Sequence, residues 1–131
     1  MSLNDQISDA LTCIRNAQKA GHEAVSIKSN KMLESILEIL KNEGFIESFQ
    51  KENDKMKKKA VITLKYHKGA PVIQGIRKIS TPGRRVYVSW KNIKPVLNNI
   101  GINILSTPKG VITGKEAKFQ HVGGEYICEV W

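Results

Sequence analysis

The hydrophobic periodicity of this chain changes from a helical to a strand pattern within its first 68 residues, and this change constrains the fold more than any other feature. Two amphipathic helices are predicted by apolar residues at helical spacing: Ile7, Ala10, Leu11, Ile14 and Ala17, then Met32, Leu33, Ile36, Leu37 and Leu40. Residues 24–27, 45–52 and 60–66 are typical of strands, and in the last of these Ile62, Leu64 and Tyr66 share one face. The order predicts an α/β half in which both helices cover one small sheet.

The predicted helices are bounded by residue types that favour helix ends. The first helix is expected to begin with a capping box at Ser2 and Asp5 and to stop at Gly21. The second is expected to begin at the N-cap Asn30 and to stop at Gly44. Residues 53–59 predict a basic hairpin loop between the last two strands. Residues 67–71 interrupt the pattern, so we expect an N-terminal half at residues 1–68 and a C-terminal half at residues 69–131.

The C-terminal half is predicted to be mostly antiparallel sheet with short helices. Strands are expected at 72–79, 85–89, 102–106, 111–113 and 125–130, and helices at 93–100 and 115–119. Pro82 and Gly83 fit the central positions of a type II turn, and Pro95 is admissible only in the first turn of its helix. We therefore expect an α+β protein whose two halves pack against each other.

Positive charge is concentrated in the second half of the chain. The 131 residues carry a net charge of +9, of which residues 1–68 contribute +3 and residues 69–131 contribute +6. A half that is rich in lysine and arginine and poor in carboxylates is typical of a polyanion-binding protein, and it favours nucleic acid over a membrane or an acidic protein. A basic surface that serves only solubility is the alternative.

Cysteine usage and hydropathy indicate a reducing compartment. Cys13 and Cys128 lie far apart without a CxxC motif, so we expect neither a disulfide nor structural zinc, and we expect both thiols to be buried and inert. The pattern predicts no transmembrane helix and no secretory signal.

Catalytic motifs are almost absent. Residues 110–115 place a lysine after a glycine but lack the spacing of a phosphate-binding P-loop. Glu125 and Glu129 are expected on one face of the last strand, where they form either a carboxylate pair or an ordinary charged surface. His22, His67 and His121 stand alone. We therefore expect that the protein is not an enzyme and that it binds no metal ion or cofactor.

Three segments combine hydrogen-bond donors, flat groups and close-approaching backbone, as nucleic-acid surfaces do. They are residues 106–110 (Ser-Thr-Pro-Lys-Gly), 123–125 (Gly-Gly-Glu) and 84–87 (Arg-Arg-Val-Tyr). Each also has a plain interpretation, as a hairpin turn or a core aromatic. Phosphate contacts in the first half are expected from Lys28, Lys31 and residues 55–59.

These segments and others along the chain resemble a known family. Residues 101–113 (Gly-Ile-Asn-Ile-Leu-Ser-Thr-Pro-Lys-Gly-Val-Ile-Thr), the terminal 122–131 (Val-Gly-Gly-Glu-Tyr-Ile-Cys-Glu-Val-Trp), residues 79–87 and residues 9–17 are all similar to the bacterial ribosomal protein S-eight family. The resemblance covers essentially the whole chain.

The resemblance implies a two-part, non-enzymatic protein of the small ribosomal subunit, monomeric outside the ribosome. It implies binding to the central domain of small-subunit ribosomal RNA early in assembly, contact with neighbouring ribosomal proteins and, in some bacteria, binding to its own operon messenger RNA. The location implied is the cytoplasmic ribosome, or the plastid stroma for an organelle-encoded chain. RNA-binding residues implied or supported by this reasoning are Ser106, Thr107, Lys109, Gly110, Gly124, Glu125, Tyr87, Arg84, Arg85 and Lys31.

One position departs from the family pattern, because Pro108 stands where the family usually has a serine. Proline removes a hydroxyl and an N–H donor and stiffens the loop.

The alternatives to the ribosomal interpretation are a general RNA- or DNA-binding architectural protein and an RNA-processing enzyme.

Overall fold

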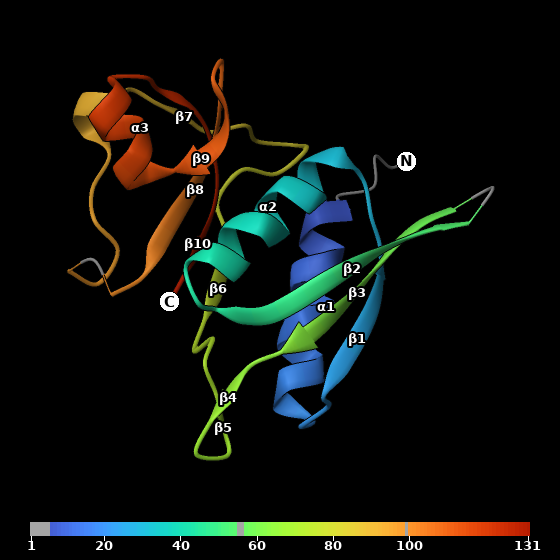
Figure 1. Ribbon diagram of the computed structural model, residues 1–131. Coiled ribbons are helices and arrows are strands. Elements are labelled where there is room, and N and C mark those ends of the chain that lie inside the picture. The colour runs from blue at the N-terminus through green and yellow to red at the C-terminus, as the bar shows by residue number, and fades with distance from the viewer. Residues whose placement is uncertain (1–5, 55–56, 99) are drawn as a thin grey trace. The chain divides into compact units, whose positions relative to one another are not determined.

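The structure, a computed structural model, describes residues 6–54, 57–98 and 100–131, which form two compact units at residues 6–74 and 75–131 (Figure 1). In the first unit, an antiparallel sheet has the order β1-β3-β2. Its elements are α1 (Gln6–Lys19), β1 (Ala24–Lys28), α2 (Lys31–Asn42), β2 (Ile46–Asp54) and β3 (Lys57–Leu64). Helix α1 packs on β1 and α2 packs on β2.

The core of the first unit follows the predicted periodicities. The fully buried residues include, on the helices, Leu11, Ile14, Leu33 and Leu37 and, on β3, Ile62. The alternation along β3 leaves one face of the sheet apolar, and this is the face that an amphipathic helix needs to cover.

The helix ends use the expected residues. The Asn30 side chain accepts a hydrogen bond from the Leu33 backbone N–H at 2.8 Å, as an N-cap does. Gly21 and Gly44 follow the two helices with φ angles of 78° and 84°, in the left-handed region that glycine adopts without strain. The capping box expected at Ser2 and Asp5 lies outside the described residues.

Two local expectations in the first unit were wrong, and the expected interruption has a specific form. Met32 is 37% exposed and does not belong to the core. The expected loop at 53–59 is mostly strand, since β2 runs to Asp54 and β3 begins at Lys57. The interruption at 67–71 is a hairpin between β4 (Tyr66–His67) and β5 (Ala70–Pro71). Lys68 and Gly69 connect these strands with positive φ angles of 52° and 81°, as in a type I′ turn.

The second unit is built on a five-stranded sheet with the order β6-β10-β8-β9, in which β7 also pairs with β10. Its elements are β6 (Ile76–Lys78), β7 (Tyr87–Val88), the 3₁₀ helix η1 (Trp90–Asn92), β8 (Ile102–Thr107), β9 (Gly110–Thr113), α3 (Gly114–Gln120) and β10 (Gly124–Val130). Ile93, Leu105 and Ala117 form a buried cluster that joins α3 to one face of this sheet. All the strand pairs are antiparallel, and the predicted α+β class is confirmed.

The helix expected at 93–100 is absent from the described part of this segment. Lys94 precedes Pro95, and a residue before proline is disfavoured in the helical region. Leu97 and Asn98 instead have positive φ angles of 46° and 54° and form a turn. Ile93 and Val96 are buried but Leu97 and Ile100 are exposed, so the four apolar residues do not form the single buried face that a helix would give.

Two predicted strands and one turn also differ. The strands expected at 72–79 and 85–89 shrink to β6 and β7. Gly83 does not have the positive φ that a type II turn requires. The turn is closed instead by two backbone hydrogen bonds between Thr81 and Arg84, at 3.0 and 3.1 Å.

Among the described helices, none combines the length and the apolar character needed to cross a membrane.

Candidate nucleic-acid interface

The hairpin between β8 and β9 is ordered by the Thr107 side chain. Thr107 pairs with Gly110 across the turn. The Thr107 hydroxyl accepts from the Lys109 backbone N–H at 3.1 Å and donates to the Gly110 carbonyl at 2.8 Å. Pro108 and Lys109 form the exposed tip, and Gly110 has a φ of 110°. The Thr107 hydroxyl therefore serves the turn, while the Lys109 ammonium is presented to solvent.

Three of the predicted site residues lie side by side across neighbouring strands. Glu125 on β10 is in register with Tyr87 on β7 and with Ser106 on β8. Residues paired in this way project from the same face of a sheet, so an aromatic ring, a carboxylate and a hydroxyl form one row. Tyr87 is highly exposed, at 71%, and the Ser106 hydroxyl has no hydrogen-bond partner among the described residues.

Gly124 allows the strands to approach closely at this row. A Cβ atom at Gly124 would lie 2.0 Å from the Ser106 carbonyl oxygen. Only a residue without a side chain fits there, so Gly124 sets the spacing between Glu125 and Ser106. This is a structural reason for the glycine that the sequence pattern does not provide.

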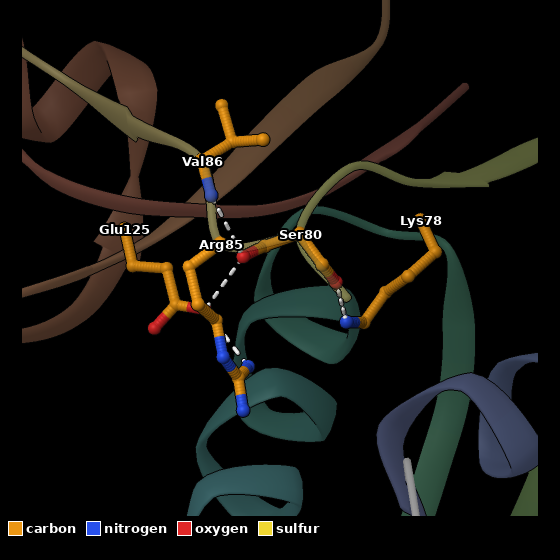
Figure 2. Close-up of polar contacts among 5 residues, drawn as sticks. All are labelled: Lys78, Ser80, Arg85, Val86 and Glu125. Carbon is orange, nitrogen blue, oxygen red and sulfur yellow. Dashed lines mark hydrogen bonds and ion pairs between the residues drawn. The ribbon is translucent and has the colours of Figure 1, made fainter. Parts of the chain in front are cut away.

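The Glu125 carboxylate is held by a buried serine and a neighbouring arginine (Figure 2). Its Oε2 atom accepts from the Ser80 hydroxyl at 2.7 Å and from Arg85 Nη1 at 3.1 Å. The Ser80 hydroxyl also accepts from the Val86 backbone N–H at 3.1 Å, and the Lys78 ammonium donates to the Ser80 carbonyl. Arg85 is thus an ion-pair partner of Glu125 as well as a surface cation.

The two remaining predicted cations are Arg84 and Lys31. Arg84 is exposed in the turn before Arg85, and in the described parts of the chain it has no ion pair. Lys31 is exposed at the first position of α2, in the other unit. The structure therefore brings together Tyr87, Arg85 and the residues of β8, β9 and β10 within the second unit.

Comparison with known proteins gives a family for this architecture. The family model described as Ribosomal protein S8 matches residues 5–131. The chain belongs to the ribosomal protein S8 family. It is 50% identical to small ribosomal subunit protein uS8 of Nitratidesulfovibrio vulgaris over 129 residues, which cover 98% of this chain and 99% of that protein. Identity is 50% to the Roseiflexus castenholzii uS8 and 43% to the Thermosynechococcus vestitus uS8, each over the full length of both chains.

Membership of the ribosomal protein S8 family confirms the predicted resemblance and the expectation of a ribosomal, non-enzymatic protein. The two carboxylates considered as an acid–base pair do not share a face. Glu125 pairs with Ser106 and Glu129 pairs with Asn103, three residues apart on β8, so they project from opposite faces. The expectation of a common face was wrong because a β-bulge between Tyr126 and Cys128 shifts the register.

Each of these carboxylates in this S8-family protein has its own arginine. Arg77 Nε lies 3.3 Å from Glu129, whose other oxygen accepts from the Tyr126 hydroxyl at 2.7 Å. Burial, and then this hydrogen bond, raise the pKa of Tyr126 to about 12. Among the described residues, no group of three histidine, cysteine or carboxylate side chains is placed to hold a metal ion.

Residues that the sequence analysis did not assign to the site include Ser80 and Trp90. Ser80 is fully buried behind Glu125, and the only sequence signal was a Ser-Thr-Pro-Gly turn. The Trp90 ring stacks on His121 with centroids 4.2 Å apart, and the Lys91 ammonium lies 5.7 Å from the Trp90 ring centre. The Ser80–Glu125 and Trp90–His121 contacts have no local sequence signature, because in each the partners come from separate segments of the chain.

The two thiols differ in exposure. Cys128 is buried, and burial raises the pKa of its thiol to about 12. Cys13 lies exposed on α1, so the expectation that both thiols are buried was wrong for Cys13.

Proposed function

We propose that this protein is a structural component of the small ribosomal subunit that binds the central domain of small-subunit ribosomal RNA. The observation that supports this most directly is the row of Tyr87, Glu125 and Ser106 beside the Thr107–Gly110 hairpin. Single-stranded and irregular RNA is recognised through unstacked bases and 2′-hydroxyls, which need aromatic faces, hydrogen-bond acceptors and hydroxyls. This row offers one of each.

The basic residues of the same unit provide the affinity that is independent of RNA sequence. Residues 69–131 carry a net charge of +6, and two of their three carboxylates are ion-paired to Arg77 and Arg85. Lys109, Arg84, Lys91 and Lys94 are exposed and are the cations we assign to phosphate contacts. Lys31 on the first unit contacts a second RNA segment in this proposal.

Hydroxyl and carboxylate groups provide the specificity. The Ser106 hydroxyl can donate to or accept from a ribose, and Glu125 accepts from a 2′-hydroxyl or a base amino group. Gly124 and Gly110 let the backbone approach the RNA without a side chain in between. In this division of roles, phosphate contacts position the RNA and the row reads it.

The wider assignments follow from family membership. We propose that the partners include neighbouring small-subunit proteins and, as a regulatory target, the messenger RNA of its own operon. The relatives named above come from bacteria, and we propose the ribosome of a bacterial cytoplasm as the location. We also propose that residues 69–131 act as the main RNA-binding domain and residues 1–68 as the supporting one.

The test is the binding of the purified full chain to a central-domain RNA fragment and to a scrambled RNA of equal length, across a salt series. Specific recognition predicts about a thousandfold preference for the fragment that persists at moderate salt. Equal and steeply salt-dependent binding to both RNAs would contradict the proposal. Equal affinity for duplex DNA would favour the alternative of a general architectural nucleic-acid-binding protein.

A further inference from the structure

The Glu125 carboxylate has one occupied oxygen and one open oxygen. Oε2 receives two donors, the Ser80 hydroxyl at 2.7 Å and Arg85 Nη1 at 3.1 Å. Oε1 has no partner among the residues that the structure describes, and it points away from both donors in Figure 2. The Glu125 side chain is 22% exposed, whereas that of Arg85 is 51% exposed.

The two donors to Oε2 differ in how firmly they are held. Arg85 is a long side chain that is half exposed, and ion pairs of this kind are screened by solvent. Ser80 is fully buried, its backbone N–H donates to the Ile127 carbonyl at 3.3 Å, and its hydroxyl also accepts from the Val86 N–H at 3.1 Å. The rotation of the Glu125 carboxylate is therefore limited mainly by Ser80.

We infer that Ser80 is a positioning residue for RNA recognition, which acts by fixing Oε2 of Glu125 so that Oε1 is presented as the acceptor. This inference rests on the proposed function. A carboxylate oxygen held in this way accepts from a 2′-hydroxyl or a base amino group and repels a phosphate oxygen, because phosphate offers no donor. Ser80 therefore determines specificity for donor-bearing groups of the RNA, although it is buried and does not touch the RNA.

The first test is a double-mutant cycle with Ser80→Ala, Glu125→Gln and the combined variant, each measured with the central-domain fragment and with scrambled RNA. We expect Ser80→Ala to lose about tenfold in affinity for the fragment, the size typical of one hydrogen bond to a charged group, and to bind scrambled RNA unchanged. Because Ser80 acts through Glu125, the combined variant should bind the fragment as Glu125→Gln does. A purely structural role for Ser80 would weaken both RNAs and give additive losses, and either result would overturn the inference.

A matched pair of arginines separates charge from positioning. Arg84 and Arg85 are adjacent and exposed, but only Arg85 is bonded to Glu125. Arg84→Gln and Arg85→Gln remove the same charge and should lower the affinity for scrambled RNA equally. Because Ser80 holds the carboxylate, the two arginine variants should also lose similar affinity for the fragment, and a fragment-selective loss in Arg85→Gln as large as that in Ser80→Ala would overturn the inference.

Folding is checked by circular dichroism, since Ser80→Ala leaves the Val86 N–H without its partner. If that variant does not fold, Ser80→Cys keeps the size of the side chain and a weaker donor. It should then show a fragment-selective loss, and wild-type binding of the fragment by this variant would refute the inference. Failure of the wild-type protein to distinguish the two RNAs would instead refute the proposed function.

Discussion

The substitution Gly124→Ala is predicted to separate the two central strands, β10 and β8, of the sheet in the second unit. The added Cβ would lie 2.0 Å from the Ser106 carbonyl oxygen and 2.8 Å from its carbonyl carbon. The shortest ordinary carbon–oxygen contacts between strands are about 3.3 Å, so β10 and β8 must move apart by about 1 Å at this point. Both atoms belong to the backbone and cannot rotate away as a flexible side chain can.

The expected cost combines overpacking with weakened pairing. Overpacking of this kind costs about 1–3 kcal/mol, and the loss of one ladder hydrogen bond adds about 1 kcal/mol. A decrease of about 2–4 kcal/mol in the free energy of unfolding is tolerable for a domain of ordinary stability, which is about 5–15 kcal/mol. The variant should therefore fold, but Glu125 and Ser106 should lose their register, and affinity for the central-domain fragment should fall more than about tenfold.

The assay is urea unfolding together with RNA binding, and Gly83→Ala is the matched control. A Cβ at Gly83 meets no atom within 4 Å, and the φ of Gly83 is not positive, so alanine should change the stability by less than about 0.5 kcal/mol. If Gly124→Ala unfolds at the same urea concentration as Gly83→Ala and binds the fragment equally well, the reasoning from close strand approach is refuted.

Three further predictions concern the hairpin, the thiols and alkaline pH. Thr107→Ala should weaken binding of the cognate fragment selectively, because the turn loses both hydrogen bonds of the hydroxyl, whereas Thr107→Ser should keep wild-type binding. Lys109→Ala should weaken binding of cognate and scrambled RNA alike. Equal losses for both RNAs with Thr107→Ala would contradict this prediction. Iodoacetamide at pH 8 should label Cys13 and leave Cys128 intact in the folded protein, as mass spectrometry of digested peptides can show; labelling of Cys128 before unfolding would contradict its burial. The pKa values of Cys128 and Tyr126 are raised from 9.0 and 10.0 to about 12, so their contribution to stability is complete below pH 9 and is lost as the pH rises from 9 to 12. Urea midpoints measured between pH 8 and 11 should therefore decline, and less steeply in Cys128→Ala, measured relative to its own midpoint at pH 8.

Long periodic elements could be predicted from the sequence because their signal is local. The apolar positions of α1 and α2 and the Asn30 cap each depend on neighbours within a few residues. The segment after Ile93 could not be predicted in this way, since Ile93 and Val96 are buried at helical spacing without forming a helix. There, the restriction imposed by Pro95 outweighs the periodicity.

The candidate site shows the same division between local and long-range information. The hairpin at Thr107–Gly110 follows from its own turn residues. The bond between Ser80 and Glu125 joins residues 45 positions apart, and no local pattern indicates it. The pairing partners of Glu125 depend on strand order, which no local sequence pattern determines.

If the second unit binds RNA as proposed, the β-bulge in β10 explains how this basic unit can carry carboxylates and still attract RNA. By placing Glu125 and Glu129 on opposite faces, the bulge gives each its own arginine, at 3.1 and 3.3 Å. A carboxylate paired in this way adds little negative potential at the distance of a Debye length, yet still accepts hydrogen bonds at contact distance. In the proposed RNA-binding role, attraction of the RNA and discrimination among its groups therefore operate at different ranges, and Glu125 would select a hydrogen-bond donor within a surface whose net charge remains positive.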